Sequence, residues 1–137
     1  MQGEEGHELP NLEQHEATAE TALICQTLVA KKAHAVTVLD VSALTSVADH
    51  FVVASSGSRL GVQALCDAVH EALREHGLPV LRSEGYAEGR WVCLDCGDVL
   101  VHVFQDAVRE YFDLERLWGD APRHDWTEEM PALLSGA

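Results

Sequence analysis

The run from residue 91 to residue 104, "WVCLDCGDVLVHVF", constrains the fold more than any other part of the chain. Two apolar segments flank a Gly-Asp pair at positions 97 and 98, a pair that suits a two-residue hairpin turn. Counting outward from that turn pairs the two arms residue by residue, from Cys96 with Val99 to Trp91 with Phe104. Because cross-strand partners share a face and neighbours along a strand alternate, one face is wholly apolar. We expect that face to lie in a core: Val92, Leu94, Cys96, Val99, Val101 and Val103.

The opposite face of this hairpin mixes polar and aromatic side chains: Trp91, Cys93, Asp95, Leu100, His102 and Phe104. A zinc site or disulfide at "CLDC" is disfavoured, because cysteines three apart in a strand point to opposite faces and the chain has no second cysteine pair. A nucleophilic Cys93 activated by His102 is an alternative. Cysteine nucleophiles usually lie at helix starts or in loops, so we favour a packed thiol beside a histidine used for contact. The sequence predicts no metal, no cofactor and no catalytic residue here.

The rest of the chain alternates between helix and strand patterns. "EATAETALICQTLVAKK" has helical spacing, and Ser58 as N-cap with Gly77 as the stop predicts a second helix. "AVTVLDV" and "HFVVASS" predict two strands, "LPVLRSEGYAEG" a weaker one, and "DAVREYFDLERLW" one or two short helices. This order predicts an α/β fold with a mixed sheet of about five strands flanked by helices. We expect an acidic flexible tail over 1–14, a single domain over 15–121, and a C-terminal tail over 122–137 whose composition is that of a loop.

The charge balance limits the classes of partner. Nine Lys plus Arg oppose 23 Asp plus Glu, giving a net charge of -14, which disfavours direct contact with a nucleic-acid backbone and favours a basic protein partner. No apolar run approaches the roughly 18 residues of a membrane span, and the acidic start "MQGEEGHELP" is unlike a secretory signal. We therefore expect a cytoplasmic location, no membrane contact and free thiols.

The turn "GSRLG" offers a second reading, because Gly57 and Ser58 before a helix resemble the phosphate-binding turn of nucleotidyltransferases. Such enzymes also need two carboxylates on one strand face to hold magnesium. Asp67 falls inside the helix, and Asp95 and Asp98 are three apart with the second in a turn. We favour an N-cap serine, and a nucleotidyltransferase-like nucleotide-binding protein remains the alternative.

Several spaced segments resemble the ribosomal silencing factor family (RsfS, or Iojap): "VLDVSALTSVADHFVVASSGSRLGVQAL", "SEG" and "RWVCLDCGDVLVHVFQDAVREYFDLERLW". The likeness runs from about Lys31 to Ala121. The specific part consists of Trp91, Asp95, Gly97, Asp98, His102, Phe104, Arg109, Leu114, Glu115, Leu117 and Trp118. At Cys96 the family more often has a tyrosine or an aliphatic residue, so the resemblance gives the cysteine pair no role.

The resemblance implies a non-enzymatic translational repressor. Such proteins bind the large ribosomal subunit through ribosomal protein L fourteen and block joining of the small subunit. It also implies a nucleotidyltransferase-like topology and a homodimer.

The residues expected to contact the partner are Glu84, Trp91, Asp95, Asp98 and His102. Arg109 is expected to be an internal ion-pair anchor for the C-terminal helices. Tyr111, Leu114, Leu117 and Trp118 are expected to pack that segment on the sheet or across a dimer interface.

Overall fold

A computed structural model describes residues 19–127 of the chain. The tail predicted over 1–14 lies outside this range, as does the end of the C-terminal tail from residue 128. Within the described part, no helix combines the length and the hydropathy that crossing a membrane requires.

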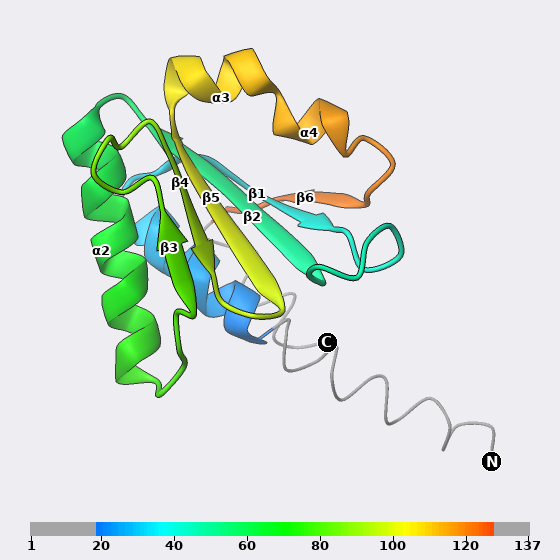
Figure 1. The fold of residues 1–137 in the computed structure, drawn as a ribbon, viewed down its shortest axis with the longest axis horizontal. Coiled ribbons are helices and arrows are strands. Elements are labelled where there is room, and N and C mark those ends of the chain that lie inside the picture. The colour runs from blue at the N-terminus through cyan, green and yellow to red at the C-terminus, as the bar shows by residue number, and fades with distance from the viewer. Residues whose placement is uncertain (1–18, 128–137) are drawn as a thin grey trace.

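A six-stranded mixed sheet forms the centre of the fold (Figure 1). Its strands are β1 (His34–Asp40), β2 (His50–Ser56), β3 (Arg82–Glu84), β4 (Trp91–Asp95), β5 (Val99–Gln105) and β6 (Arg123–Asp125). They lie in the order β3-β4-β5-β2-β1-β6, and only β2 and β5 pair in parallel. The predicted α/β class with a mixed sheet is confirmed.

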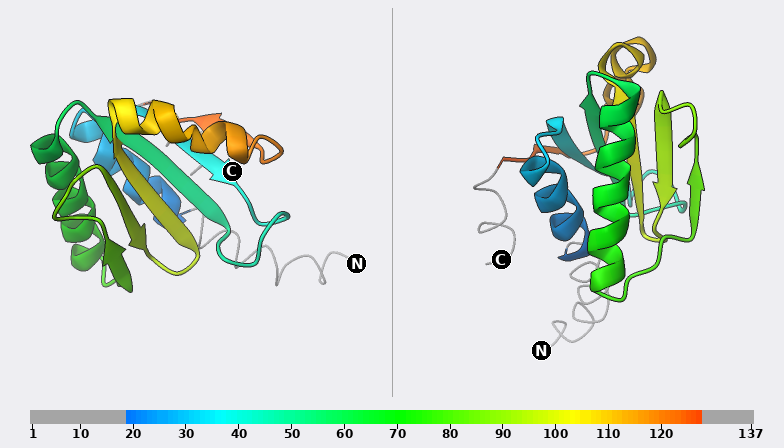
Figure 2. Two further views of the ribbon diagram at one scale, coloured as in Figure 1. Left: turned by 45° about the horizontal axis from the view of Figure 1, so that its top comes forward. Right: turned by 90° about the vertical axis from the view of Figure 1, so that its left-hand side faces the viewer.

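Helices cover both faces of this sheet, as the two views of Figure 2 show. The helical residues 19–30 and α2 (Arg59–Glu75) lie on one face, and α3 (Asp106–Phe112) and α4 (Leu114–Leu117) cross the other. Ser58 is the N-cap of α2, and its Oγ accepts a hydrogen bond of 3.0 Å from the Gly61 amide. The stripe of α2 that faces the sheet is buried, as its helical spacing predicts: Val62, Leu65, Cys66, Val69 and Leu73.

The hairpin has the register that counting from its turn predicts. Trp91 pairs with Phe104, Cys93 with His102 and Asp95 with Leu100. All six residues of the apolar face are buried in the main core, beneath residues 19–30 and α2. The alternation of apolar and polar residues, together with the position of the turn, thus predicts both the register of the hairpin and the face that is buried.

The prediction that the chain is a loop after residue 121 is wrong at residues 123–125. These residues form the edge strand β6, which pairs with β1. Arg-His-Asp has none of the β-branched or aromatic residues that mark strands in sequence. The pairing is anchored next to it, because Trp126 is buried in the main core and its amide donates to the Val36 carbonyl at 2.7 Å. Both outer strands, β3 and β6, are three residues long with every residue exposed.

Candidate protein-interaction surface

The face of the sheet crossed by α3 and α4 divides into two parts. Over β5, β2 and β1 lies a second core, here called the covered half, made of Leu39, Val41, Ala48, Phe51, Val53, Phe104, Leu114 and Ala121. Toward β3 and β4 the same face carries side chains that are half-buried or exposed. We call this part the open surface and define it as Arg82, Glu84, Trp91, Cys93, Asp95 and Leu100. The short C-terminal helices cover one part of the face, so the other part remains accessible.

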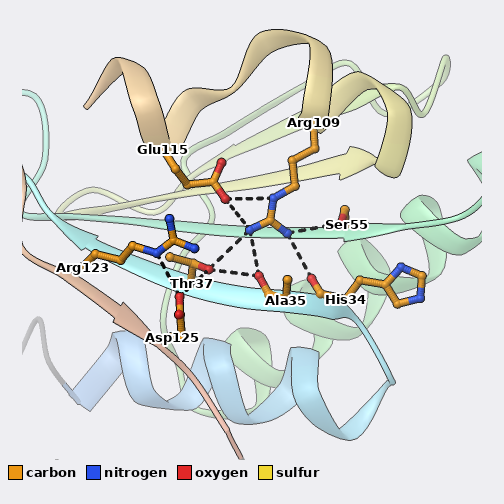
Figure 3. A network of polar contacts seen from close by, with 8 residues as sticks. All are labelled: His34, Ala35, Thr37, Ser55, Arg109, Glu115, Arg123 and Asp125. Carbon is orange, nitrogen blue, oxygen red and sulfur yellow. Dashed lines mark hydrogen bonds and ion pairs between the residues drawn. The ribbon is translucent and has the colours of Figure 1, made fainter. Parts of the chain in front are cut away.

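Arg109 holds the covered half together from α3 (Figure 3). Its Nη2 and Nε donate to Glu115 Oε2 at 2.6 and 3.1 Å, and the two side chains are only 11% and 13% exposed. The remaining donors bind the carbonyls of His34 and Ala35 and the hydroxyls of Ser55 and Thr37. The prediction of an internal ion-pair anchor for the C-terminal helices is confirmed.

A bulge in β1 makes part of this network possible. The register of β1 against β2 shifts between His34 and Thr37, and Ala35 has a φ of 48°. This left-handed conformation is unfavourable for alanine, but it leaves the Ala35 carbonyl 2.8 Å from Arg109 Nη2. The guanidinium therefore stabilises a backbone conformation that the strand alone would avoid.

Trp91 is the aromatic side chain of the open surface. Its ring is half-buried, stacks on Phe104 at a centroid distance of 4.8 Å and an interplanar angle of 29°, and meets Phe112 of α3 at 4.9 Å. The indole Nε1 donates to His102 Nδ1 at 3.1 Å. One edge of the indole is thus held by the protein, so the orientation of the ring is already fixed in the free domain.

His102 lies below Trp91 and is 7% exposed. Burial lowers the pKa of its imidazole to about 4, so the ring is neutral near pH 7. Phe51 approaches it edge-on at 5.1 Å. Among the residues described, His102 Nε2 has no hydrogen-bond partner.

Four of the five residues expected to contact a partner share one face. Glu84 pairs across the strands with Cys93, which pairs with His102, and Trp91 and Asp95 flank Cys93 at alternate positions of β4. Of these, Glu84 is exposed, Trp91 and Asp95 are half-buried and His102 is buried. Asp95 also serves the hairpin turn, because its Oδ1 accepts the Gly97 amide at 3.0 Å.

Asp98 is the exception, since it lies in the hairpin turn and outside this face. Its carbonyl accepts hydrogen bonds from the amides of Asp49 and His50 at 2.8 and 3.2 Å, and Asp98 itself is exposed. The structure gives Asp98 a role in joining the turn to the loop between β1 and β2.

The sequence analysis missed Phe112, whose ring contacts Trp91 and is 46% exposed. Phe112 lies four residues after Val108, which packs on the covered half, and residues four apart in a helix share a face. This spacing could have placed Phe112 on the side of α3 that faces the sheet. Of the residues expected to pack, Leu114 is buried and Trp118 meets Phe51 at 5.0 Å, whereas Tyr111 is 81% exposed and Leu117 projects likewise. Phe112 therefore extends the open surface onto α3, and Tyr111 lies beside it with a ring-centroid distance of 5.0 Å.

Catalytic and metal chemistry find little support in the described residues. Cys96 lies in the main core and Cys93 on the opposite face, and burial raises the pKa of their thiols to about 12 and about 11. Residues 19–127 contain no group of three His, Cys, Asp or Glu placed to hold a metal ion. A Cβ at Gly57, before α2, would lie 3.8 Å from Asp106 Oδ2, a carboxylate that disfavours a phosphate there.

The fold and this surface define an α/β domain with an accessible sheet face that combines aromatic and charged side chains. A family model described as "Ribosomal silencing factor during starvation" matches residues 14–134, and the chain belongs to that family. The chain is 42% identical over 95 residues to ribosomal silencing factor RsfS of Bacillus subtilis, covering 69% of this chain and 80% of the relative. It is 40% identical over 105 residues to the RsfS of Halalkalibacterium halodurans, covering 77% and 86%. A crystal structure of a Chromobacterium violaceum protein superposes with a TM-score of 0.72 at 40% identity, covering 74% of this chain and 84% of that one.

Proposed function

We propose that this protein represses translation by binding the large ribosomal subunit through ribosomal protein L fourteen, so that the small subunit cannot join. The observation that carries the proposal is the open surface, where a pre-oriented Trp91 lies at one end of β4, next to a patch that contains the carboxylates of Glu84 and Asp95. Half-buried aromatic side chains with a charged rim are typical of sites where a few residues supply most of the affinity.

Charge supports a basic ribosomal protein as the partner. The net charge of -14 attracts a basic surface over long range, which raises the association rate more than the final affinity. Inhibition then needs no chemistry, because a bound domain excludes the small subunit from the same area. Family membership across most of the chain points to the same activity. The proposed place of action is the cytoplasm.

Light scattering of purified large and small subunits tests this function directly. Increasing amounts of the protein, added first to large subunits, should reduce joining in proportion to dose, and the protein should co-sediment with large subunits. Normal joining at saturating protein would reject the proposal.

Charge and aromatic variants locate the contact. Glu84→Lys should weaken binding, whereas Glu75→Lys makes the same charge change on α2 at the other face and should not. Trp91→Ala should weaken binding at least roughly tenfold, since anchor residues commonly contribute about 2 kcal/mol or more. Leu60→Ala, at an exposed position of α2, is the matched control. Equal binding by Glu84→Lys, Trp91→Ala and both controls would remove the open surface from the site.

A homodimer is proposed on the family likeness alone. Analytical ultracentrifugation over a range of protein concentrations should show a mass twice that of the 15.0 kDa chain. A single species of monomer mass at all concentrations would reject it.

A further inference from the structure

A buried histidine lies directly under the tryptophan of the open surface. His102 Nδ1 accepts a hydrogen bond of 3.1 Å from the Trp91 indole N–H, and this is the one hydrogen bond of the imidazole ring among the described residues. Since Nδ1 accepts, the neutral ring carries its proton on Nε2. With 7% of its surface exposed, His102 offers a partner almost nothing to touch.

The aromatic neighbours of Trp91 do not by themselves define which edge of the indole faces outward. Phe104 stacks on the ring and Phe112 meets it at a tilt. A flip of the indole by about 180° about its Cβ–Cγ bond would keep the plane of the ring and exchange its two edges. A hydrogen bond is directional, so the single N–H of the indole selects one orientation. The acceptor for that N–H therefore determines what Trp91 presents to a partner.

We infer that His102 is a positioning residue, which holds the Trp91 indole in one orientation on the open surface and does not itself touch the partner. The inference rests on the proposed function for its effect on ribosome binding, but the orientation of the indole is measurable without any ribosome. Burial of His102 among Phe51, Phe104 and Trp91 keeps the imidazole neutral, so its lone pair stays available to the indole near pH 7.

Two variants of the same branched shape separate positioning from packing. His102→Asn places an amide oxygen near the position of Nδ1, whereas His102→Leu has no acceptor. The Trp91 indole resonance, identified by its loss in Trp91→Phe, reports the hydrogen bond through its proton exchange rate. Exchange should be slow in the original protein and in His102→Asn, and about tenfold faster in His102→Leu, as the loss of one hydrogen bond predicts.

Binding to purified large subunits, measured by co-sedimentation, should follow the same order. His102→Leu should bind up to about tenfold more weakly than His102→Asn. A purely structural role predicts the reverse, because a buried leucine is better tolerated than an asparagine with unpaired amide protons. The inference would be overturned if His102→Leu showed the same indole exchange rate and the same binding to large subunits as the unaltered protein.

A double variant keeps the test decisive if His102→Asn does not fold. In the Trp91→Phe background there is no indole to position, so His102→Leu should cause no further loss of binding. An additional loss there would overturn the positioning role. If the unaltered protein fails to bind large subunits, the ribosome proposal fails, and indole exchange alone decides the role of His102.

Discussion

The covered half and the open surface belong to one face of one sheet, yet they differ in how their charged groups are paired. In the covered half, Arg109 supplies donors to Glu115, to two backbone carbonyls and to two hydroxyls. On the open surface, the exposed Glu84 lies 3.7 Å from an exposed Arg82, and the half-buried Asp95 accepts the Gly97 amide. The difference teaches that α3 and α4 bury one half of a sheet face and leave the other half accessible to solvent.

Removing Arg109 should produce the largest loss of stability. Arg109→Ala leaves the Glu115 carboxylate buried without its cation, and we expect a loss of about 3–5 kcal/mol in the free energy of unfolding in urea. Arg74→Ala breaks an exposed pair with Glu71 on α2 and should cost less than about 1 kcal/mol. Similar losses in both variants would show that burial does not distinguish the two ion pairs.

The histidine at the boundary between the two parts should make stability depend on pH. Burial lowers the pKa of His102 from 6.5 to about 4, so between these values the unfolded chain binds a proton that the folded chain does not. Stability should therefore fall by about 3 kcal/mol as the pH drops through this window, with no further loss from this group below about 4. The cross-strand neighbours of His102 are Cys93 and Val53, and Phe51, Phe104 and Trp91 complete its surroundings.

Urea unfolding at pH 7 and pH 4.5 measures this contribution as the difference between the protein and His102→Leu. The variant should lose less stability on acidification. His70→Leu replaces an exposed histidine of α2 and serves as the control. Equal pH dependence in the protein and His102→Leu would contradict the burial argument.

The strained alanine of the covered half should respond in the opposite sense to a matched alanine elsewhere. Ala35→Gly relieves a φ of 48° and should raise the free energy of unfolding by about 0.5–1 kcal/mol. Ala64→Gly, at an exposed position in the interior of α2, should lower it by about 1 kcal/mol. Losses of the same size at both positions would show that the bulge carries no strain.

The open surface should show the smallest effect on stability. Glu84→Lys changes an exposed residue of β3 whose pairing with Arg82 is weak, and the free energy of unfolding should stay within about 0.5 kcal/mol. The same variant should slow association with large subunits, because it removes a charge that attracts a basic partner. A large loss of stability on thermal unfolding would mean that Glu84 belongs to the structure and not to the binding site.

Local patterns predicted the parts of the fold that local rules determine. The Gly-Asp turn at residues 97–98 and strict alternation fixed the hairpin register, and Ser58 marked the start of α2. The parallel pairing of β2 with β5 and the edge strand β6 depend on contacts between distant residues. Trp126 illustrates the limit, because nothing in "RHDW" shows that its indole enters the main core.

The candidate site shows the same limit. The two-residue repeat of a β-strand correctly predicted that Trp91, Asp95 and His102 share one face. The burial of His102, however, depends on its packing beneath Trp91 and beside Phe51. Whether a residue on a shared face touches a partner or supports its neighbour is decided by the elements that cross the sheet. Phe112 was missed for that reason, since its contact with Trp91 joins α3 to β4.

The two short outer strands also bear on how the protein avoids association through its sheet. In both β3 and β6 an arginine and a carboxylate two residues apart form an exposed ion pair, Arg82 with Glu84 and Arg123 with Asp125. A strand from another chain would find a ladder of three residues with a charge at each end, which resists edge-to-edge aggregation. The protein thus keeps the hydrogen-bonding edges of its sheet short and charged, which leaves the side chains of the sheet faces as the surface available for contacts.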